Sequence, residues 1–438
     1  MTAVPPPPSG ATAAGPEPDA LASLDRWRLR PGVTASALDG GLHLRGWNGS
    51  VTLEGSPALP ALWQVLEEAL RTDGAAALCA RAGLGTPVRA ALCTLIGQLH
   101  AHGMLVGRPA PTGGTAPDDW LLTVADRPAE AAAALAGSRL EVRAADPQDA
   151  LASAAVRALA RAGITAVRAA DAPAGRPGRI LLHGSRADGT ECAVGAAVHP
   201  DGAFVTPVGG LTRAGSDTAA LAERLGLDEP PARSAAPSPA LTALVAGAAV
   251  QRLLCSLAGL PDPGAEEGAG EGAGGADPAG ATGRVGPRSG FPLVLVAGER
   301  PPRSAYHPWP ARSPEAAPPP GTLAEALEGL AALTDERLGV LAAPATGALP
   351  QLPVALAGCE APGGGVLTAG AARADLARLD ALCRAVELRC GAGRAVAGAG
   401  PGHALGRALR RAAIRDLKST HLNSSHRTAN LGWRRGMV

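Results

Sequence analysis

Few residues in this sequence have the types and spacing that catalysis requires. His100 and His102 lie near Cys93 along the chain, and side chains of these types bind zinc. Residues two apart on a helix point to different faces, so the sequence predicts no zinc site there. No Ser-His-Asp, Cys-His or phosphate-loop signature is present. The loop that contains His307 and Trp309 is interpreted as packing, and we assign no catalytic residue.

The region from Ser138 to Ala170 has the strand–helix–strand order of a nucleotide-binding unit. Its strand-to-helix turn, Ala144–Asp149, lacks the GxGxxG glycines that let the backbone approach phosphates. Asp146 and Asp149 also place negative charge at the helix N-terminus, where an anion would bind. We therefore do not expect adenylation by this region.

The composition of the 438 residues excludes several classes of protein. Aromatic residues make up only 2%, so any core must be built from Leu and Val with Ala as a spacer. The seven cysteines are scattered without a CxxC pair, which argues against a zinc ribbon and against a disulfide-rich secreted domain. The N-terminus lacks a signal-peptide pattern, and Gln251 and Arg252 interrupt the most apolar helix, Leu241–Leu257. We expect a cytoplasmic protein that does not bind membranes.

Charge is distributed unevenly along the chain. Residues 404–438 hold eight basic residues and one acid, whereas residues 1–403 carry a net charge of −6. This mildly acidic body is not built to bind nucleic acid. Residues 414–438 contain Lys418, the only lysine, and 417–426 resemble adapter sequence translated at the end of an assembled contig. We expect this tail to be artefactual and the natural protein to be longer; a genuine basic tail that binds an acidic partner is the alternative.

Residues 23–107 follow a Pro- and Ala-rich stretch, 1–22, that we expect to be disordered. Their pattern predicts three short strands followed by three helices. The expected strands are Trp27–Leu29, Leu42–Trp47 and Val51–Leu53, with Asn48-Gly49 as a hairpin turn, and the expected helices are Leu59–Leu70, Ala75–Ala82 and Pro87–Leu99.

This order of elements resembles the PqqD-like winged-helix modules that recognise leader peptides in peptide-maturation enzymes. The resemblance implies that an extended peptide pairs with the free edge of the third strand while the third helix reads its side chains. The residues that it assigns to peptide binding are Val51, Thr52, Leu53, Arg89, Leu92 and Ile96. A role in the core is the alternative for Leu92 and Leu99. A DNA-binding winged helix is disfavoured, because the third helix offers only Arg89 and two histidines to phosphates.

Residues 118–310 alternate strands and helices, which predicts an α/β domain and an α+β chain overall. The expected strands are Trp120–Val124, Leu140–Arg143, Ile164–Val167, Ile180–His183, Ala193–Val198 and Phe291–Val296. The expected helices are 128–136, 147–163, 218–225 and 241–257, and residues 261–290 are expected to form a flexible insertion. The domain resembles the ThiF-like fold, and its missing glycine loop implies a scaffold that has lost the adenylation site.

Residues 322–403 resemble the beginning of a YcaO domain. Leu333–Val340 looks like the opening of that domain, and Ala377–Arg389 looks like its first nucleotide-site helix. The family presents two acids three apart in an EAxER pattern, whereas here Arg384 occupies the first position and Glu387 the second. The resemblance implies ATP and Mg²⁺, with Glu387 as the nucleotide or metal candidate. A solvated surface role for Glu387 is the alternative.

These resemblances imply a component of the enzymes that make thiazole/oxazole-modified peptides (TOMMs), a class of ribosomally synthesised natural products that includes bacteriocins. In that chemistry a Cys, Ser or Thr side chain attacks the preceding amide carbonyl, and ATP phosphorylates the resulting oxygen so that it can leave. We expect the leader-peptide-binding component of a fused cyclodehydratase, whose full-length form would perform the ATP-dependent cyclisation through its YcaO part and which does not catalyse alone as this chain. The expected partners are a precursor peptide and a separate YcaO enzyme or dehydrogenase, and a homodimer is left open. The alternative is a non-catalytic scaffold that docks a separate YcaO enzyme.

Overall fold

The structure is a computed structural model that describes residues 26–47, 49–72, 78, 86–108, 119–169, 176–229, 236–264, 291–310, 320–361, 364–391 and 396–414. Several predictions fall outside these ranges: the disorder of 1–22, the turn at Asn48, the helix at 75–82 apart from Leu78, the insertion beyond residue 264 and the tail beyond residue 414. The chain divides into two compact units, residues 1–138 with 257–260 and residues 139–256 with 261–438.

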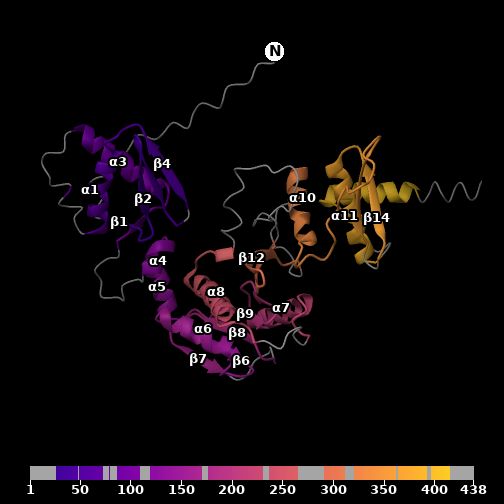
Figure 1. The fold of residues 1–438 in the computed structure, drawn as a ribbon, viewed down its shortest axis with the longest axis horizontal. Helices are drawn as coiled ribbons and strands as arrows, with labels where there is room; N and C mark the ends of the chain where they lie inside the picture. Colours follow the sequence, from indigo (N-terminus) through magenta and orange to yellow (C-terminus); the bar gives the residue numbers. More distant parts are fainter. Residues whose placement is uncertain are drawn as a thin grey trace, which may run out of the picture. The chain divides into compact units, whose positions relative to one another are not determined.

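Residues 26–108 of the first unit form small sheets that pack on helices (Figure 1). We call this part the N-terminal module. Its strands are β1 Trp27–Leu29, β2 Thr34–Leu38, β3 Gly41–Arg45, β4 Ser50–Glu54 and β5 Leu105–Gly107, and its helices are α1 Leu59–Arg71 and α3 Thr86–Ala101. The order β2-β3-β4 forms one antiparallel sheet, and β1 pairs with β5.

The core of the N-terminal module follows from the spacing of its apolar residues. Leu42 and Leu44 alternate along β3 and are buried, as expected for a strand with one face on the core. Helix α1 has Pro60 in its first turn and buries Leu66 and Leu70, which lie four apart on one face. The first and third predicted helices and all three predicted strands are therefore present.

Three features of the module differ from the prediction or were absent from it. All five residues of β2 are exposed and most are Ala, Ser or Thr, so this strand has no apolar alternation by which it could be recognised. β1 pairs with β5, a strand that the prediction did not include. Trp47 lies beyond the end of β3 and is 44% exposed, so the predicted second strand was too long.

The segment Trp120–Val124, predicted as a strand, is instead part of helix α4 (Asp119–Val124), and α5 (Pro128–Ala136) follows as predicted. Short apolar runs do not distinguish a strand from a buried helix. A buried arginine supplies the physical reason for the helix. Nη1 of Arg30 donates to the carbonyls of Thr123 (3.0 Å) and Ala125 (2.8 Å), at the end of α4 where carbonyls have no partner within the helix.

The second unit is built on a seven-stranded sheet with the order β12-β11-β10-β9-β8-β6-β7. Its strands are β6 Arg139–Ala144, β7 Ala166–Ala169, β8 Arg179–Ser185, β9 Glu191–His199, β10 Gly202–Val205, β11 Leu293–Glu299 and β12 Pro302–Pro308. β6 and β7 pair in parallel on either side of helix α6 (Ala150–Arg161), and every other neighbouring pair of described strands is antiparallel. The mixed α/β class is confirmed, with a mostly antiparallel sheet.

Helix α7 (Leu211–Arg224) approaches β9 closely at Gly195. A Cβ atom at Gly195 would overlap Oγ1 of Thr218 and would lie 3.2 Å from the carbonyl oxygen of Ala214. Glycine therefore sets how closely α7 lies on the sheet.

Helix α8 (Pro239–Ala258) has the length and composition to cross a membrane, but 61% of its most apolar window is buried within the protein. Its charged residue, Arg252, is 1% exposed. The Arg252 guanidinium donates to the carbonyls of Thr206 (2.9 Å) and Leu293 (2.6 Å) and to Asp262 Oδ1 (3.0 Å). The charge is satisfied inside the protein, as a buried charge requires, and α8 is a core helix.

The segment around His307, predicted as a loop, is the end of β12, and only Trp309 of that motif lies beyond the strand. Prolines at both ends of β12 disguise it, since proline is tolerated there only because β12 is an edge strand. Trp309 is buried, and its Nε1 donates to Asp217 Oδ1 on α7 at 3.0 Å. The packing role is confirmed for Trp309.

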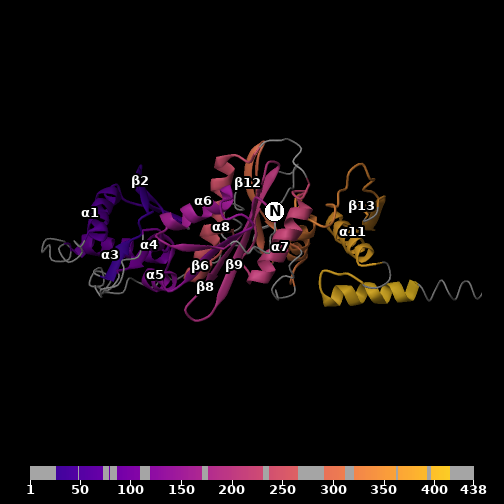
Figure 2. The same ribbon diagram turned by 90° about the horizontal axis from the view of Figure 1, so that it is seen from below.

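The C-terminal part of the second unit is a β-hairpin covered by a helix. Its elements are α10 Leu323–Ala331, the 3-10 turn η3 Ala332–Thr334, β13 Ala355–Glu360, β14 Val366–Ala371 and α11 Ala374–Arg389. Helix α11 packs on both strands of the hairpin and contains the segment Ala377–Arg389, which the sequence analysis expected to be a helix. Figure 2 shows a further helix, residues 401–414 in yellow, running beside α11.

Candidate functional site

The strand predicted to bind a peptide lies at a sheet edge. In the described part of the chain, β4 pairs with β3 and with no other strand. Antiparallel neighbours alternate between pairs that exchange backbone hydrogen bonds and pairs that do not. At the two ends of the ladder, Gly46 N donates to Gly49 O (2.8 Å) and Gly55 N donates to Gly40 O (3.2 Å). By this alternation, the backbone N–H and C=O groups of Val51 point toward β3 and bond to it. Those of Leu53, two residues further along, do the same.

The remaining residues of β4 direct their backbone N–H and C=O groups away from β3. These residues are Ser50, Thr52 and Glu54, whose side chains are also exposed. None of their N–H groups has a hydrogen-bond partner among the residues that the structure describes. The strand therefore offers alternating donors and acceptors to an extended chain.

The side chains of β4 divide between the core and the solvent. Val51 and Leu53 are half-buried and pack on the core of the N-terminal module, which fixes the strand. Thr52 faces outward, and its Oγ1 lies 2.9 Å from Nδ1 of His43 on β3. At this edge a ligand would thus meet the backbone of Thr52 and not the side chains of Val51 and Leu53.

Helix α3 offers fewer ligand contacts than predicted. Leu92 and Ile96 are 1% and 4% exposed and lie in the core of the module together with Leu99. The core role of Leu92 and Leu99 is confirmed, and it extends to Ile96, so these side chains do not reach a ligand in this structure. Arg89 is exposed, and its role in peptide binding stays a prediction.

His100 on α3 contacts an aromatic ring. The ring of His100 meets the edge of Trp27, with 4.9 Å between ring centroids. Among the described residues, no three His, Cys, Asp or Glu side chains gather in a way that would hold a metal ion.

Arg30 is a structural residue that the sequence analysis missed. Besides its bonds to the carbonyls of α4, its Nε donates to Gly103 O (2.8 Å) and its Nη2 to Asp126 Oδ1 (2.9 Å). The buried guanidinium therefore joins the N-terminal module to α4 and to the start of the next turn. In sequence, Arg28 and Arg30 flank Leu29 like two solvated strand positions, so nothing distinguishes the buried Arg30 from the half-buried Arg28.

The turn before α6 is closed to anions. Asp149 is the N-cap of α6, and its Oδ1 accepts from Leu151 N at 2.8 Å. Its Oδ2 accepts from Gly178 N at 3.1 Å. A protein carboxylate therefore occupies the place at the helix N-terminus that a phosphate would need.

The nucleotide and metal candidate, Glu387, is buried, with 3% of its side chain exposed. Its Oε1 accepts from Arg407 Nη2 at 3.2 Å and from Ala397 N at 3.1 Å, and its Oε2 lies 2.9 Å from Arg411 Nη2. Both arginines belong to the helix formed by residues 401–414. The solvated surface role is therefore wrong, because this carboxylate anchors a helix.

The other acid on this side of α11 is also occupied. Asp380 pairs with Arg384 at 2.9 Å and with Arg407. Burial beside these groups raises the pKa of the Cys383 thiol to about 11. Mg²⁺ requires oxygen ligands that are free to coordinate it, and the carboxylates of this cluster already bind arginines. The residues present do not fit an ATP–Mg²⁺ site, and we assign them no chemical step.

No protein-family model and no curated protein matches the sequence. Among solved structures, a heterocyclase in complex with substrate and cofactor aligns over 86% of this chain and 55% of its own, with 14% identity and a TM-score of 0.43. The heterocyclase TruD aligns over 65% of this chain and 41% of its own, with 13% identity and a TM-score of 0.34. E. coli MccB aligns over 65% of this chain and 94% of its own, with 7% identity and a TM-score of 0.36.

This chain thus spans 55% and 41% of the lengths of the two heterocyclases that it resembles. All three TM-scores lie below 0.5, so the function proposed below rests on the residues of this chain.

Proposed function

We propose that this chain binds the leader segment of a ribosomally synthesised precursor peptide, as the recognition component of an azoline-forming cyclodehydratase. The open edge of β4 is the observation that supports this proposal. A peptide laid along β4 would exchange hydrogen bonds with the backbones of Ser50, Thr52 and Glu54 and would extend the sheet by one strand. Each such bond contributes about 1 kcal/mol net, so side-chain contacts must supply the remaining affinity.

Arg89 is the candidate for one of those side-chain contacts. It is exposed on α3, and a guanidinium binds the carboxylate of an acidic peptide residue through paired hydrogen bonds. The same helix otherwise exposes small or weakly basic residues such as Thr94, Gly97 and His100. One arginine is too little charge to hold a nucleic-acid backbone, so a peptide fits this surface better than DNA or RNA.

We assign the ring-forming step to a partner. In azoline formation a Cys, Ser or Thr side chain of the precursor attacks the preceding carbonyl, and ATP-dependent phosphorylation removes the carbonyl oxygen. Glu387 and Asp380 are held by arginines, which favours a role for this chain as the scaffold that presents the precursor to a separate YcaO-type enzyme. The partner would supply ATP and Mg²⁺, and the cytoplasm is the proposed location.

A proline substitution tests the proposed edge. Thr52→Pro removes an outward N–H and places a ring where the peptide would lie, while Val51 and Leu53 keep their bonds to β3. With the precursor peptide encoded beside this gene as a fluorescent probe, we expect anisotropy to show about tenfold or greater loss of affinity. Val51→Pro is a poorer test, because the Val51 amide bonds within the sheet.

The opposite edge of the same sheet provides the matched control. The alternation of bonds in the β2–β3 ladder directs Ala35 and Ala37 outward from β2. Ala37→Pro should bind the probe within about twofold of the parent chain. Equal losses in Thr52→Pro and Ala37→Pro, or an unchanged Thr52→Pro, would contradict binding at β4.

ATP consumption separates the scaffold from a fused enzyme. The chain mixed with its precursor should consume no ATP, and consumption should begin when a YcaO-type enzyme encoded nearby is added. Turnover by the chain alone would instead favour the fused cyclodehydratase.

A further inference from the structure

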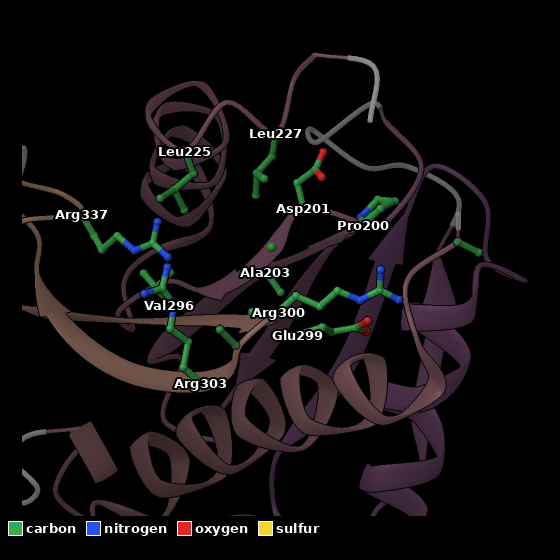
Figure 3. Close-up of a pocket in the computed structure, with 14 residues that line it drawn as sticks. Pro200, Asp201, Ala203, Leu225, Leu227, Val296, Glu299, Arg300, Arg303 and Arg337 are labelled. Carbon is green, nitrogen blue, oxygen red and sulfur yellow. The ribbon is translucent and has the colours of Figure 1, made fainter. Parts of the chain in front are cut away.

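A cavity of about 320 Å³ lies in the second unit, on the side of the sheet that faces the end of α7 (Figure 3). Its apolar surface comes from Val296 on β11 and from Leu225 and Leu227 at the end of α7. A volume of this size is at the lower end of the range for small-molecule sites. The cavity shares no residue with the edge of β4 or with the Glu387 cluster.

Two arginines point toward one another at one end of this cavity. Arg303 comes from β12 and Arg337 from the turn after η3, and both line this end of the cavity (Figure 3). Neither guanidinium has a hydrogen-bond or ion-pair partner within the described part of the chain. Arg303 is exposed and Arg337 is half-buried, so both guanidiniums are open to an anion from solvent.

The two acids that line the cavity, Asp201 and Glu299, interact with other residues. Arg300 extends away from the pair, on the side of Glu299 (Figure 3). Glu299 Oε1 accepts from Ser238 N at 2.8 Å, and this hydrogen bonding holds the pKa of the Glu299 carboxyl below its usual value. Asp201 Oδ2 lies 3.5 Å from His199 Nδ1. The acids therefore have partners of their own and do not neutralise Arg303 and Arg337.

A hydrogen-bonded contact between β12 and the turn sets the position of the two arginines. Arg303 and His307 lie four apart on β12 and hence on the same face of the strand. Nδ1 of His307 lies 3.0 Å from Asp335 Oδ2, while Asp335 Oδ1 accepts from the backbone N of Arg337 at 2.9 Å. The turn that contains Arg337 is thus fastened to the strand that contains Arg303.

We propose that this cavity binds an organic carboxylate with a small aliphatic group beside it, the chemistry of an apolar amino acid or peptide C-terminus. Two guanidiniums at one end of the cavity match the two oxygens of a carboxylate, and each charge-assisted hydrogen bond is stronger than a neutral one. The aliphatic group would lie on Val296 and the two leucines at the end of α7. The site does not depend on the proposed leader-peptide function.

The probe for this site is N-acetyl-leucine, with N-acetyl-leucinamide as the same molecule without the charge and inorganic phosphate as an anion without the aliphatic group. Calorimetry on the whole chain should detect N-acetyl-leucine and no leucinamide. Arg303→Gln and Arg337→Gln should each weaken binding about tenfold or more. Arg157→Gln, at an exposed arginine on α6, is the control and should leave binding unchanged.

Three outcomes would overturn the assignment: no binding of N-acetyl-leucine, equal binding of the leucinamide, or binding of phosphate in its place. Circular dichroism of the two variants distinguishes loss of the site from loss of the fold. Because the precursor peptide binds elsewhere, Thr52→Pro should keep full affinity for N-acetyl-leucine, which separates a failure here from a failure of the leader-peptide proposal.

Discussion

The second unit contains two arginine clusters that differ in one respect. At α11, Arg407 and Arg411 bind the buried carboxylate of Glu387. In the cavity at the end of α7, the guanidiniums of Arg303 and Arg337 face one another without a carboxylate of their own in the described structure. The first arrangement is complete within the chain, and the second lacks a counter-charge that a ligand can provide. The acid singled out by its motif therefore lies in the closed cluster.

The strongest test of the closed cluster is Glu387→Gln, which keeps the shape of the side chain and removes its charge. The substitution leaves Arg407 and Arg411 facing a neutral amide in a buried place, and breaking such a pair costs about 3–5 kcal/mol. We expect the helix formed by residues 401–414 to come away from α11. Hydrogen exchange across these residues should rise strongly.

Glu328→Gln is the matched control, because Glu328 is exposed on α10 and has no ion-pair partner in the described part of the chain. It should leave the exchange of 401–414 unchanged. If Glu387→Gln behaved like Glu328→Gln, the closed cluster would not stabilise the helix, and Glu387 would again be a candidate for a ligand.

The ion pair between Asp228 and Arg179 is only partly shielded from solvent, so it is intermediate between the two clusters. Its hydrogen bond with Arg179 holds the pKa of the Asp228 carboxyl below the usual value. A lowered folded-state pKa stabilises the protein above the unfolded value of about 3.9, and the effect is lost as pH falls through the folded value. With 32% of the Asp228 side chain exposed, screening limits the contribution to about 1 kcal/mol.

Asp228→Asn should therefore reduce stability at pH 7 by about that amount and by progressively less below pH ~4. Denaturant titrations of the parent and the variant across this pH range would measure the difference. A difference that stayed constant into strong acid would show that the carboxylate charge is not the source of the stability.

Arg337→Gln should have the smallest effect on stability, and in the opposite direction. Removing one of two unpartnered guanidiniums relieves repulsion and breaks no ion pair, so we expect a change between zero and about 0.5 kcal/mol of added stability. Thermal unfolding without ligand measures it. A clear loss of stability would mean that Arg337 has a partner within the chain, and the contrast between the two clusters would fail.

The sequence predicted those elements whose own apolar spacing defines them. Leu42 and Leu44 on β3 and Leu66 and Leu70 on α1 mark their buried faces without reference to the rest of the chain. The sequence also predicted that no anion binds at the turn before α6. Asp149 directly precedes the helix, so its side chain can cap the helix N-terminus. Local patterns of this kind were sufficient to expect β4 as a strand with a free edge.

The features that the sequence did not predict depend on distant partners. α4 is helical beside Arg30, about 90 residues away in sequence, and the run Trp120–Val124 alone suits either state. Glu387 is buried by Arg407 and Arg411, which lie on a separate helix. Arg303 and Arg337 likewise line the same cavity because His307 contacts Asp335. No spacing in the sequence indicates that contact.

The glycine under α7 also restricts how this protein can vary. Every single-base change in a glycine codon that alters the residue introduces a larger one, and at position 195 even a methyl group would collide with Thr218. Arg303, which lines the cavity beyond α7, is exposed and can be exchanged, which allows the selectivity of the cavity to drift. The distance between α7 and the sheet cannot change in the same way, because Gly195 sets it. A saturation-mutagenesis scan should therefore find the most restricted position of this region on β9, at a residue that no ligand touches.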